Sequence, residues 1–494
     1  MALLFGYDVG SSSVKATLLD AETGAAIASA TMPEKELEII AKQPGWAEQH
    51  PQTWWENLVA ATQKIKAQTN FDAGDVRGIG ISYQMHGLVI VDKNQQVLRP
   101  SIIWCDSRAV EIGKKALKNI GEKKCLSHLL NSPGNFTASK LKWVEDNEPK
   151  VYAKIHKMML PGDFIAMKMT GEIKTTPSGL SEGIMWDFQK QGLADLIMAY
   201  YRIPEELVAE VVPTFSVQGN LTKEAANTLG LKAGTIVSYR AGDQPNNALS
   251  LNVLNPGEIA ATAGTSGVVY GITAEAKYDG KSRVNTFVHV NHAPKKPRYG
   301  VLLCVNGTGI LNSWLKHNTG SSEYSEMDAM AVKAPVGSDG LVILPFGNGA
   351  ERTLENRNIG ASIHGLNFNM HNRAHLLRAA QEGIVFALNY GVEIMRKLGV
   401  KAKKVRAGHA NMFLSQLFGE AFATVTSSVV ELYKTDGSQG AARGAGIGAS
   451  IYKGPEDAFV GLTPVKTVEP NRKLSSAYAD AYKNWEKVLK QQLT

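Results

Sequence analysis

The chain has 494 residues, of which 44% are hydrophobic and 20% charged. These are the proportions of globular domains, and the length suits two large domains better than a single core. The net charge of +7 comes from lysines and arginines scattered along the sequence, no stretch approaches the ~20 apolar residues of a membrane span, and the three cysteines lack disulfide or zinc spacing. We therefore expect a cytoplasmic protein with no nucleic-acid or membrane partner.

The first elements in the chain are two predicted strands, 3–9 and 14–20, joined by a turn of glycine and serines. Glycine lets a backbone approach a ligand closely, and hydroxyl and backbone N–H groups bind anions. Asp8 precedes the turn, and a carboxylate beside a phosphate suits hydrated Mg²⁺. The motif is also compatible with an ordinary hairpin. The residues expected to contact phosphate are Ser11, Ser12 and Ser13.

Helical and strand patterns alternate over the following residues, which indicates α/β layers. A helix is predicted at 51–68, and short strands at 78–83, 88–91 and 100–104. The pair Met85-His86 falls between two of these strands, where side chains can face a cleft. A lone histidine in such a place is often part of the core instead, so both interpretations stay open.

Asp243 follows a predicted strand at 237–240 and begins a helical pattern that covers 246–251. Loops after the strands of α/β sheets often present catalytic groups, which makes Asp243 a candidate general base. An aspartate at this place can also be a helix N-cap. A helix N-terminus lowers a carboxyl pKa, so we expect a weakened base.

The second half of the chain repeats this plan from a hairpin at 259–271 onward. Its turn, Gly264-Thr265-Ser266, predicts a second phosphate loop, and Thr262 occupies the position of Asp8. The repetition favours a duplicated phosphate clamp over two unrelated hairpins. Further helices are expected at 309–316, 372–398, 440–451 and 475–492, and further strands at 341–344 and 404–408.

We place the domain boundary near residues 255–257, where Asn-Pro-Gly interrupts the pattern. The predicted domains are an N-terminal domain at 1–254, with the first phosphate loop and the base, and a C-terminal domain at 255–455. The final segment, 456–494, is predicted as a helical extension that packs back, because its last helix is amphipathic.

Several motifs together resemble the FGGY carbohydrate kinases over nearly the whole chain. The loop from Asp8 to Lys15 is similar to the family's opening motif, while Ala241-Gly242-Asp243 and Gly264-Thr265-Ser266 are similar to its base and second phosphate segments. The resemblance implies an α/β fold of two actin-like, ribonuclease H-like ATPase domains with a catalytic cleft between them. The segments that look most like the xylulokinase branch are Gly45-Trp46-Ala47-Glu48-Gln49, Gln84-Met85-His86-Gly87 and Trp104-Cys105-Asp106-Ser107-Arg108.

The resemblance also implies roles for individual residues. Asp243 would be the catalytic base, and Asp8 would hold Mg²⁺ through water, with Asp243 as a second candidate metal ligand. Trp104 could instead fill the core, and Asp106 could instead cap the next helix. The sugar-binding residues would be Met85, His86, Trp104, Asp106, Asn135 and Asp243.

ATP would be held by both phosphate loops. The segment 344–353 is similar to the family's Leu-Pro…Gly-Glu-Arg loop, with an extra residue between Gly349 and Glu351. The adenosine loop departs from the family pattern, since Ala407 and His409 stand where glycines are usual, which leaves the preferred nucleotide open. The nucleotide-binding residues would be Ser11, Ser12, Ser13, Lys15, Gly264, Thr265, Ser266, Gly349, Gly408 and Asn411.

By this resemblance the chain would be an ATP-dependent kinase that converts D-xylulose to D-xylulose 5-phosphate in pentose catabolism. Its partners would be a small sugar and the nucleotide with Mg²⁺, and a homodimer is one oligomeric state left open. A gluconate kinase or another ketose or polyol kinase is an alternative, whereas glycerol kinases have Arg-Glu where this chain has Met85-His86. An actin-like ATPase without sugar kinase activity, a different class, would release ADP independently of sugar.

Overall fold

The computed structural model describes residues 1–349, 352–400 and 403–494. The chain forms two compact units, each of which combines separate stretches of sequence. The first unit consists of Met1–Asn252, Phe287–Tyr299 and Thr435–Leu462, and the second unit of Val253–Thr286, Gly300–Lys434 and Thr463–Thr494. The domains predicted from the sequence are continuous, at 1–254, 255–455 and 456–494, and these ranges stay a prediction. In the structure each compact unit is made of three separate segments.

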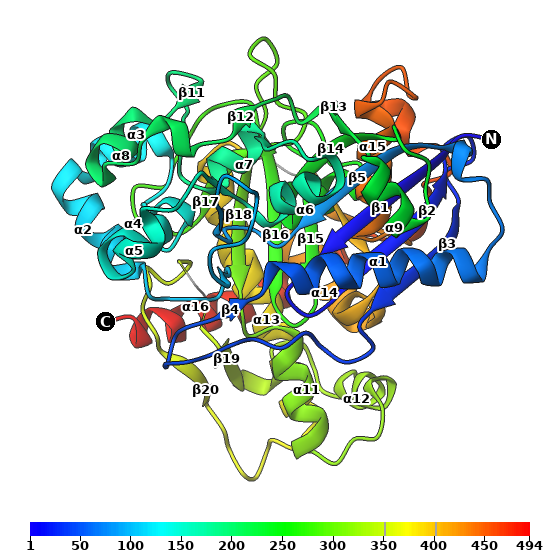
Figure 1. The fold of residues 1–494 in the computed structure, drawn as a ribbon. Coiled ribbons are helices and arrows are strands. Elements are labelled where there is room, and N and C mark those ends of the chain that lie inside the picture. Colours follow the sequence, from blue (N-terminus) through cyan, green and yellow to red (C-terminus); the bar gives the residue numbers. More distant parts are fainter. Residues whose placement is uncertain (350–351, 401–402) are drawn as a thin grey trace. The chain divides into compact units, whose positions relative to one another are not determined.

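The first unit is built around a six-stranded mixed sheet (Figure 1). Strand β1 is antiparallel to β2 and parallel to β5, which is in turn parallel to β14. The register pairs Val9 with Tyr83 and Tyr83 with Gly242, so β1, β5 and β14 end side by side. In spatial order the strands are β13 (Phe215–Asn220), β14 (Ile236–Gly242), β5 (Val76–Tyr83), β1 (Leu3–Val9), β2 (Val14–Asp20) and β3 (Ala26–Met32).

Successive side chains of β1 point to opposite faces of this sheet. Leu3, Phe5, Tyr7 and Val9 pack in a core with Trp54 of α1 (Pro51–Gln68). The other face carries α15 (Gly437–Gly448), and glycines let it lie directly on the strands: a Cβ on Gly6 or Gly80 would lie 1.9 or 2.0 Å from a carbonyl oxygen of α15. Asp8 shares the face of Gly6, and the first residue of α15 lies beside its carboxylate.

The rest of the first unit is a set of helices and short strands inserted between the strands of the main sheet. Its helices are α2 (Val110–Ile120), α3 (Glu122–Leu129), α4 (Thr137–Asn147), α5 (Pro149–Tyr152), α6 (Pro161–Thr170), α7 (Pro177–Glu182), α8 (Asp195–Tyr201), α9 (Lys223–Leu229) and α10 (Asp243–Ser250). Its short strands are β4 (Glu48–Gln49), β6 (Val89–Val91), β7 (Ser101–Ile102), β8 (Lys157–Met159), β9 (Lys174–Thr175), β10 (Trp186–Asp187), β11 (Gly192–Leu193) and β12 (Glu210–Val211).

The second unit repeats the arrangement around β15, which is antiparallel to β16 and parallel to β21. The predicted second hairpin is therefore present, and the structure adds a parallel neighbour to each hairpin. The sheet runs β17 (Asn285–Val288), β18 (Tyr299–Val305), β16 (Gly267–Thr273), β15 (Ile259–Ala263), β21 (Lys404–Gly408), β22 (Val429–Tyr433) and β23 (Pro464–Val468). A separate pair is β19 (Val342–Phe346) with β20 (Gly360–His364), and the helices are α11 (Gly309–Asn318), α12 (Tyr324–Ala331), α13 (Arg373–Lys397), α14 (Gln416–Thr426) and α16 (Ser475–Gln492).

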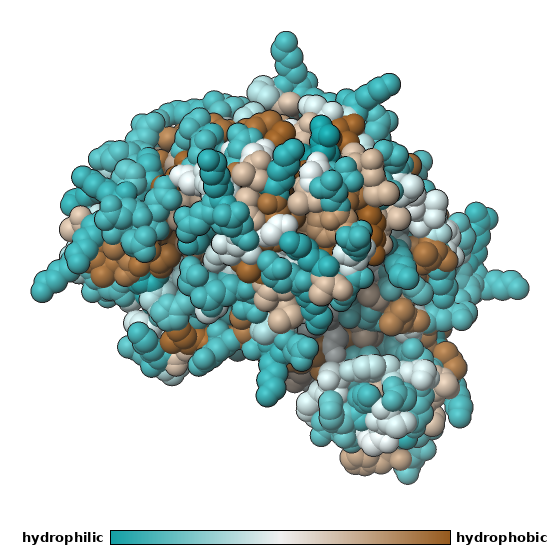
Figure 2. Space-filling model, turned by 45° about the vertical axis from the view of Figure 1, so that its right-hand side comes forward, coloured by the Kyte–Doolittle hydropathy of each residue, from teal (hydrophilic) through white to brown (hydrophobic). Residues whose placement is uncertain are grey.

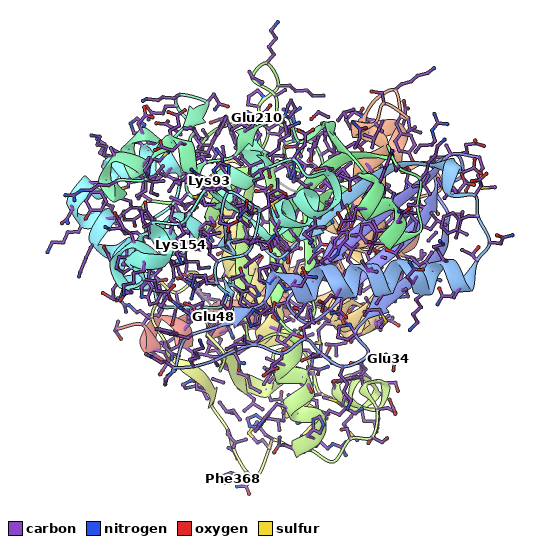
Figure 3. The ribbon with its side chains drawn as sticks, in the orientation of Figure 1. Glu34, Glu48, Lys93, Lys154, Glu210 and Phe368 are labelled. Carbon is purple, nitrogen blue, oxygen red and sulfur yellow. The ribbon has the colours of Figure 1, made fainter. Side chains whose placement is uncertain are left out.

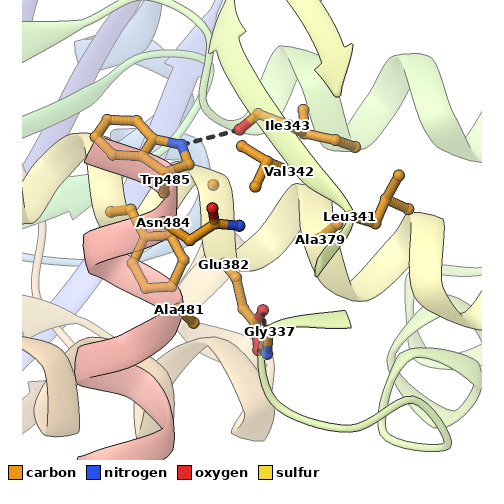
Figure 4. Close-up of a pocket in the computed structure, with 11 residues that line it drawn as sticks. Gly337, Leu341, Val342, Ile343, Ala379, Glu382, Ala481, Asn484 and Trp485 are labelled. Carbon is orange, nitrogen blue, oxygen red and sulfur yellow. Dashed lines mark hydrogen bonds between the residues drawn. The ribbon is translucent and has the colours of Figure 1, made fainter. Parts of the chain in front are cut away.

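The C-terminal helix α16 packs back into the second unit, as its amphipathic pattern predicts. Tyr478, Trp485 and Leu489 are buried in the core of this unit, and Trp485 Nε1 donates a hydrogen bond to the Ile343 carbonyl oxygen at 3.0 Å (Figure 4). The cavity between α16, α13 and β19 measures about 10 Å³, space for about one water. Its aromatic residues therefore serve packing, and the cavity cannot hold a nucleotide.

Several predicted elements differ from the observed ones by one or two residues at an end, and three differ in ways that the local contacts explain. The strand expected at 100–104 is only β7, because the residues that follow Ile103 form a turn held by Asp106, and α2 starts at Val110. The helix expected from residue 246 begins at Asp243, since Gly242 is its N-cap. The small-residue helix expected at 440–451 starts at Gly437, where Asp436 caps it through the Gln439 N–H.

The visible surface in Figure 2 is largely hydrophilic, with hydrophobic residues between the polar ones. Phe368 lies at the tip of the connection between β20 and α13 and is 90% exposed (Figure 3). Among the described residues no helix is both long and apolar enough to cross a membrane.

Candidate active site

A pocket of about 250 Å³ lies in the first unit where β1, β5 and β14 end. It is lined by Asp8, Gly10, Ser11, Ser12, Ser13, Lys15, Gln84, Trp104 and Asp243. The register explains this convergence, because the residues after the three strands meet at one edge of the sheet. The predicted phosphate turn, the predicted metal ligand and the predicted base are thus brought together.

Asp8 lies on β1 with its carboxylate held from two sides. Its Oδ1 accepts a hydrogen bond from Ser82 Oγ at 2.8 Å, and a Cβ on Gly437 would lie 2.3 Å from its Oδ2. Only glycine at the first position of α15 leaves room for this carboxylate. Burial raises the pKa of Asp8, and the nearby charge of Asp436 adds to the rise.

Asp243 is the first residue of α10, so the alternative N-cap role belongs to Gly242 instead. Burial, together with the negative charge of Asp8, raises the pKa of Asp243 to about 7. The expectation of a lowered pKa was wrong, because loss of solvation and a like charge outweigh the helix N-terminus here. A carboxylate with a pKa near neutrality can accept a proton at physiological pH.

The first phosphate turn is closed by a hydrogen bond from the Gly10 N–H to the Ser13 carbonyl oxygen at 3.0 Å. Ser11 is held by two side chains, since its carbonyl accepts from Gln49 Nε2 at 2.7 Å and its Oγ accepts from Trp104 Nε1 at 3.3 Å. Ser12 and Lys15 are exposed. The turn therefore has a fixed backbone with polar side chains available at the pocket.

His86 has a left-handed backbone with φ of +62°. Its ring contacts Phe136 edge-on at 4.6 Å between centroids and lies 5.5 Å from that of Phe287. Its Nδ1 lies 2.9 Å from the carbonyl oxygen of Glu182. Met85 beside it is buried against Gly242, next to the proposed base. Met85 therefore packs against the residue that precedes Asp243. Neither Met85 nor His86 lines the pocket described above.

The Trp104 to Arg108 turn divides into an exposed and a buried part. Trp104 is 41% exposed and lines the pocket, so it does not fill the core. Asp106 is buried, where Oδ2 accepts from the Ala47 N–H at 2.6 Å and both carboxylate oxygens accept from Arg108. Its carboxylate shapes the turn and does not cap α2, whose N-cap is Ala109.

Arg108 continues this network toward Glu48, labelled in Figure 3. Arg108 Nη1 donates to Glu48 Oε1 at 2.7 Å, and its guanidinium stacks over the Trp46 ring at 3.8 Å. Asn135 Nδ2 donates to the Asp106 carbonyl oxygen. Asn135 Oδ1 is buried and has no hydrogen-bond partner within the described parts of the chain. The predicted sugar wall therefore rests on a dense polar framework.

In the second unit, the predicted nucleotide residues gather around the turn between β15 and β16. The Gly264 carbonyl accepts from the Gly309 N–H at 2.8 Å, and Ser266 Oγ donates to Asn306 Oδ1 at 3.4 Å. The Asn306 N–H donates to the Gly349 carbonyl at 3.2 Å. Asn306, which the sequence did not single out, thus joins two of the predicted segments. Thr265 at the tip of the turn is exposed.

The predicted adenosine loop follows β21 and lies close to the same turn. Gly408 ends β21, and the left-handed Asn411 has its Nδ2 3.4 Å from the position of a Cβ on Gly264. His409 is exposed, and its N–H donates to the Tyr433 carbonyl oxygen at 2.8 Å. Ala350 and Glu351, part of the predicted Gly-Glu-Arg segment, lie outside the described residues.

Family models decide what this arrangement is. Residues 3–250 match the N-terminal domain of the FGGY family of carbohydrate kinases, and residues 259–450 match its C-terminal domain. The chain belongs to this family. It is therefore a phosphotransferase that acts on a carbohydrate, with the two-domain, actin-like ATPase fold that the sequence predicted.

The chain is similar to named proteins and to solved structures along nearly its whole length. It is 30% identical over 465 residues to a protein of Bacillus subtilis named xylulose kinase, which covers 92% of this chain and 89% of the relative. The solved xylulose kinase of Rhodospirillum rubrum is 26% identical, with a TM-score of 0.87 over 99% of this chain and 98% of that one. The solved gluconate kinase of Lactobacillus acidophilus has a TM-score of 0.91 at 21% identity, over 100% and 98% of the two chains, and shows the fold alone.

An FGGY kinase uses ATP, and the pocket of the first unit suits a hydrated Mg²⁺ as its partner. Asp8 and Asp243 supply carboxylate oxygens, and Gln84, which is 2% exposed, adds an amide Oε1 without a hydrogen-bond partner in the described chain. Mg²⁺ prefers such oxygens and keeps several waters. Within the described residues no group of three or more histidine, cysteine or acidic residues is arranged as a metal site.

The orientation of the Gln84 amide follows from its neighbours. Gln49 Nε2 donates to the carbonyls of Ser11 and Glu38, so its Oε1 must be the acceptor for Trp54 Nε1 and Gln84 Nε2. Gln84 Nε2 is thereby committed to Gln49, and its second group is an acceptor. Nothing in the sequence indicated that Gln49 and Gln84 are hydrogen-bonded to each other.

Proposed function

We propose that the chain transfers the γ-phosphoryl group of ATP to the terminal hydroxyl of D-xylulose, giving D-xylulose 5-phosphate. The observation that carries the proposal is Asp243, whose pKa of about 7 and position beside Asp8 suit it to accept the proton of a sugar hydroxyl. The relatives named xylulose kinase support the choice of sugar.

Asp243 is the proposed base in this reaction. Phosphoryl transfer passes through a loose transition state, so positioning of the hydroxyl matters more than its full deprotonation. The start of α10 fixes the backbone of Asp243, and its partly buried carboxylate lines the pocket. The ionised form of this carboxylate takes the proton that leaves the sugar oxygen.

The phosphates are held by the two turns in this proposal. Hydroxyl and backbone N–H groups of Ser11, Ser12 and Ser13 contact them in the first unit, with Lys15 as a cation, and Gly264, Thr265 and Ser266 do so in the second unit. Asp8 holds Mg²⁺ through water, with Asp243 as a second ligand, and the ion would supply positive charge against the charge that develops on the transferred group. Gly349, Gly408 and Asn411 complete the nucleotide site.

The sugar is bound in this proposal by Met85, His86, Trp104 and Asn135. Trp104 offers an exposed ring for an apolar sugar face, and Asn135 Oδ1 offers a buried acceptor for a hydroxyl. Asp106 contributes by holding the Trp104 turn and the Asn135 amide, since its own carboxylate is occupied by Arg108 and Ala47.

A substrate panel tests the proposal. ADP release is measured by a coupled assay with D-xylulose, D-gluconate, glycerol and no acceptor, at saturating ATP and Mg²⁺. We expect the highest kcat/KM with D-xylulose. A higher value with D-gluconate would make this a gluconate kinase, and ADP release that no acceptor stimulates would make it an actin-like ATPase.

A further inference from the structure

Two buried ionisable side chains with no part in the proposed chemistry flank His86. Lys140 lies on α4 and is 0% exposed, and Glu182 is the last residue of α7 and is 1% exposed. Burying a charge is costly unless its hydrogen bonds are made, so both side chains need partners. Each of them binds the backbone of His86.

Glu182 holds His86 on its N-terminal side. Its Oε2 accepts from the His86 N–H at 3.1 Å, and its Oε1 accepts from Tyr83 Oη at 2.6 Å. The backbone carbonyl of Glu182 lies 2.9 Å from His86 Nδ1. A carbonyl oxygen can only accept, so Nδ1 carries a proton. Glu182 thus fixes the backbone of His86 and the protonation of its Nδ1.

Lys140 holds His86 on its C-terminal side. Its Nζ donates to the His86 carbonyl oxygen at 2.9 Å and to the Ile103 carbonyl oxygen at 2.9 Å. Ile103 directly precedes Trp104, the exposed aromatic residue of the pocket. One amine therefore ties together the two segments of the proposed sugar wall.

The conformation of His86 explains why it needs support on both sides. A φ of +62° lies in the left-handed region, which residues with a Cβ adopt at a cost. Such a conformation persists where the surroundings over-determine it, and it recurs at ligand-binding sites. At His86 the surroundings are two hydrogen bonds from opposite sides, given by side chains of two different helices.

The ionisation of the pair agrees with a hydrogen-bonding role. Burial lowers the pKa of Lys140 to about 7, and the positive charge of Arg108 adds to this shift. The nearby Asp106, Cys105 and Glu182 oppose it. Burial raises the pKa of Glu182 well above its usual range. In either protonation state the amine has at least two N–H groups, enough for the two carbonyls that Lys140 binds.

We propose that Lys140 and Glu182 are positioning residues that hold His86 in its left-handed conformation and present its imidazole to the sugar. The proposal rests on the sugar site of the proposed function. Its chemical content is specific: the Glu182 carbonyl oxygen requires a proton on His86 Nδ1.

A double-mutant cycle tests this clamp. His86→Ala should raise the KM for D-xylulose roughly 5- to 150-fold, the effect of leaving buried polar atoms unpaired. Lys140→Met should raise it about 10- to 100-fold, because misplacing a binding group by 1 Å can cost 10²-fold. In the His86→Ala background, Lys140→Met should raise KM by a clearly smaller factor, because only its bond to Ile103 beside Trp104 is then left to lose. Lys142→Met is the matched control on the same helix, where Lys142 pairs with Glu145 and Asp146, and should leave KM unchanged.

Equal effects of Lys140→Met in both backgrounds would overturn the proposal, as would a lowered unfolding midpoint with unchanged KM. If Lys140→Met does not fold, the Glu182 side is tested instead. Glu182→Gln keeps an acceptor for the His86 N–H and should stay near the normal KM, while Glu182→Leu should not. Imidazole ¹⁵N signals of the wild-type protein add a readout independent of turnover: we expect protonated Nδ1, and a protonated Nε2 with bare Nδ1 would contradict the clamp even if the substrate proves different.

Discussion

The two phosphate turns share a scaffold and differ in what surrounds them. Each joins an antiparallel hairpin whose first strand has a parallel neighbour, β5 for β1 and β21 for β15. At the same place in the hairpin, the first has Asp8 and the second has Thr262. Asp8 faces Ser82, Gly437 and the charges of Asp243 and Asp436, whereas the second turn is lined by amide and hydroxyl groups such as Asn306.

This difference indicates that the two copies of a duplicated loop can take different roles in one reaction. A buried carboxylate beside another carboxylate raises a pKa and attracts a cation, which suits the chemistry of transfer. Neutral donors around a turn can bind phosphate without changing any pKa, which suits holding the nucleotide. Substitutions in one turn should therefore affect catalysis, and matched substitutions in the other should affect nucleotide affinity.

The largest effect is expected for the base on the side of the first turn. Asp243→Asn removes the proton acceptor and should lower kcat about 10²- to 10⁴-fold. Nucleotide affinity should persist, because both turns remain intact, and it can be measured by titration calorimetry with ATP. A variant with near-normal kcat would remove Asp243 from the mechanism.

The matched pair Asp8→Ala and Thr262→Ala compares the two turns directly. Losing a residue that orients metal-bound water commonly costs 10–100-fold in metal affinity, so Asp8→Ala should raise the Mg²⁺ concentration for half-maximal rate by about that factor. Thr262→Ala should leave the Mg²⁺ dependence unchanged. Mg²⁺ titrations of both variants at fixed ATP and sugar measure this, and equal shifts would mean that the turns do not differ in the way proposed.

Thr265→Ala probes the second turn and should have a smaller effect. One hydrogen bond contributes about 0.5–1.5 kcal/mol, so the KM for ATP should rise roughly 2- to 13-fold. The KM for D-xylulose should stay within error. A change confined to the sugar KM would contradict the assignment of Thr265 to the nucleotide.

The smallest change is a shift in pH dependence without loss of the fold. With a pKa of about 7, Asp243 is protonated below neutral pH, so kcat/KM should fall as pH drops below about 7 and level off above it. Asp8→Asn removes the negative charge that helps to raise this pKa, so the Asp243 titration should move to lower pH. Carboxyl ¹³C NMR of the metal-free protein follows the titration directly, and an unchanged midpoint would show that Asp8 does not act on Asp243.

The sequence predicted those parts of the site that depend on local pattern. The hairpin of β1 and β2 placed Asp8 and the serines, and α1 and α16 have the predicted bounds, because strand and helix periodicity fix such elements. Asp243 was found from its place after a strand. Its pKa was predicted in the wrong direction, because burial of Asp243 and its proximity to Asp8 both depend on the tertiary fold. Asp8 is more than two hundred residues away in the sequence.

Other parts could not be predicted because they depend on tertiary contacts. Lys140 and Lys142 are two residues apart on one helix, yet one is buried and the other binds acidic residues near the surface. Nothing local distinguishes them. Gln84 and Glu182 likewise gain their roles from partners on other elements, namely Gln49 and Tyr83. Asp106 was assigned to the sugar from its motif, whereas in the structure its carboxylate accepts hydrogen bonds from Arg108.

The glycine contact between α15 and the sheet has a consequence for the order of synthesis. The strands of the first unit are made early, but α15 is translated only after two of the three segments of the second unit, Val253–Thr286 and Gly300–Lys434. Until then Gly6 and Gly80 lack the helix that covers them, and Asp8 lacks the neighbouring Gly437. Before α15 is made, one face of the N-terminal sheet therefore lacks its covering helix. The pocket around Asp8 can be completed only after Gly437 has been translated.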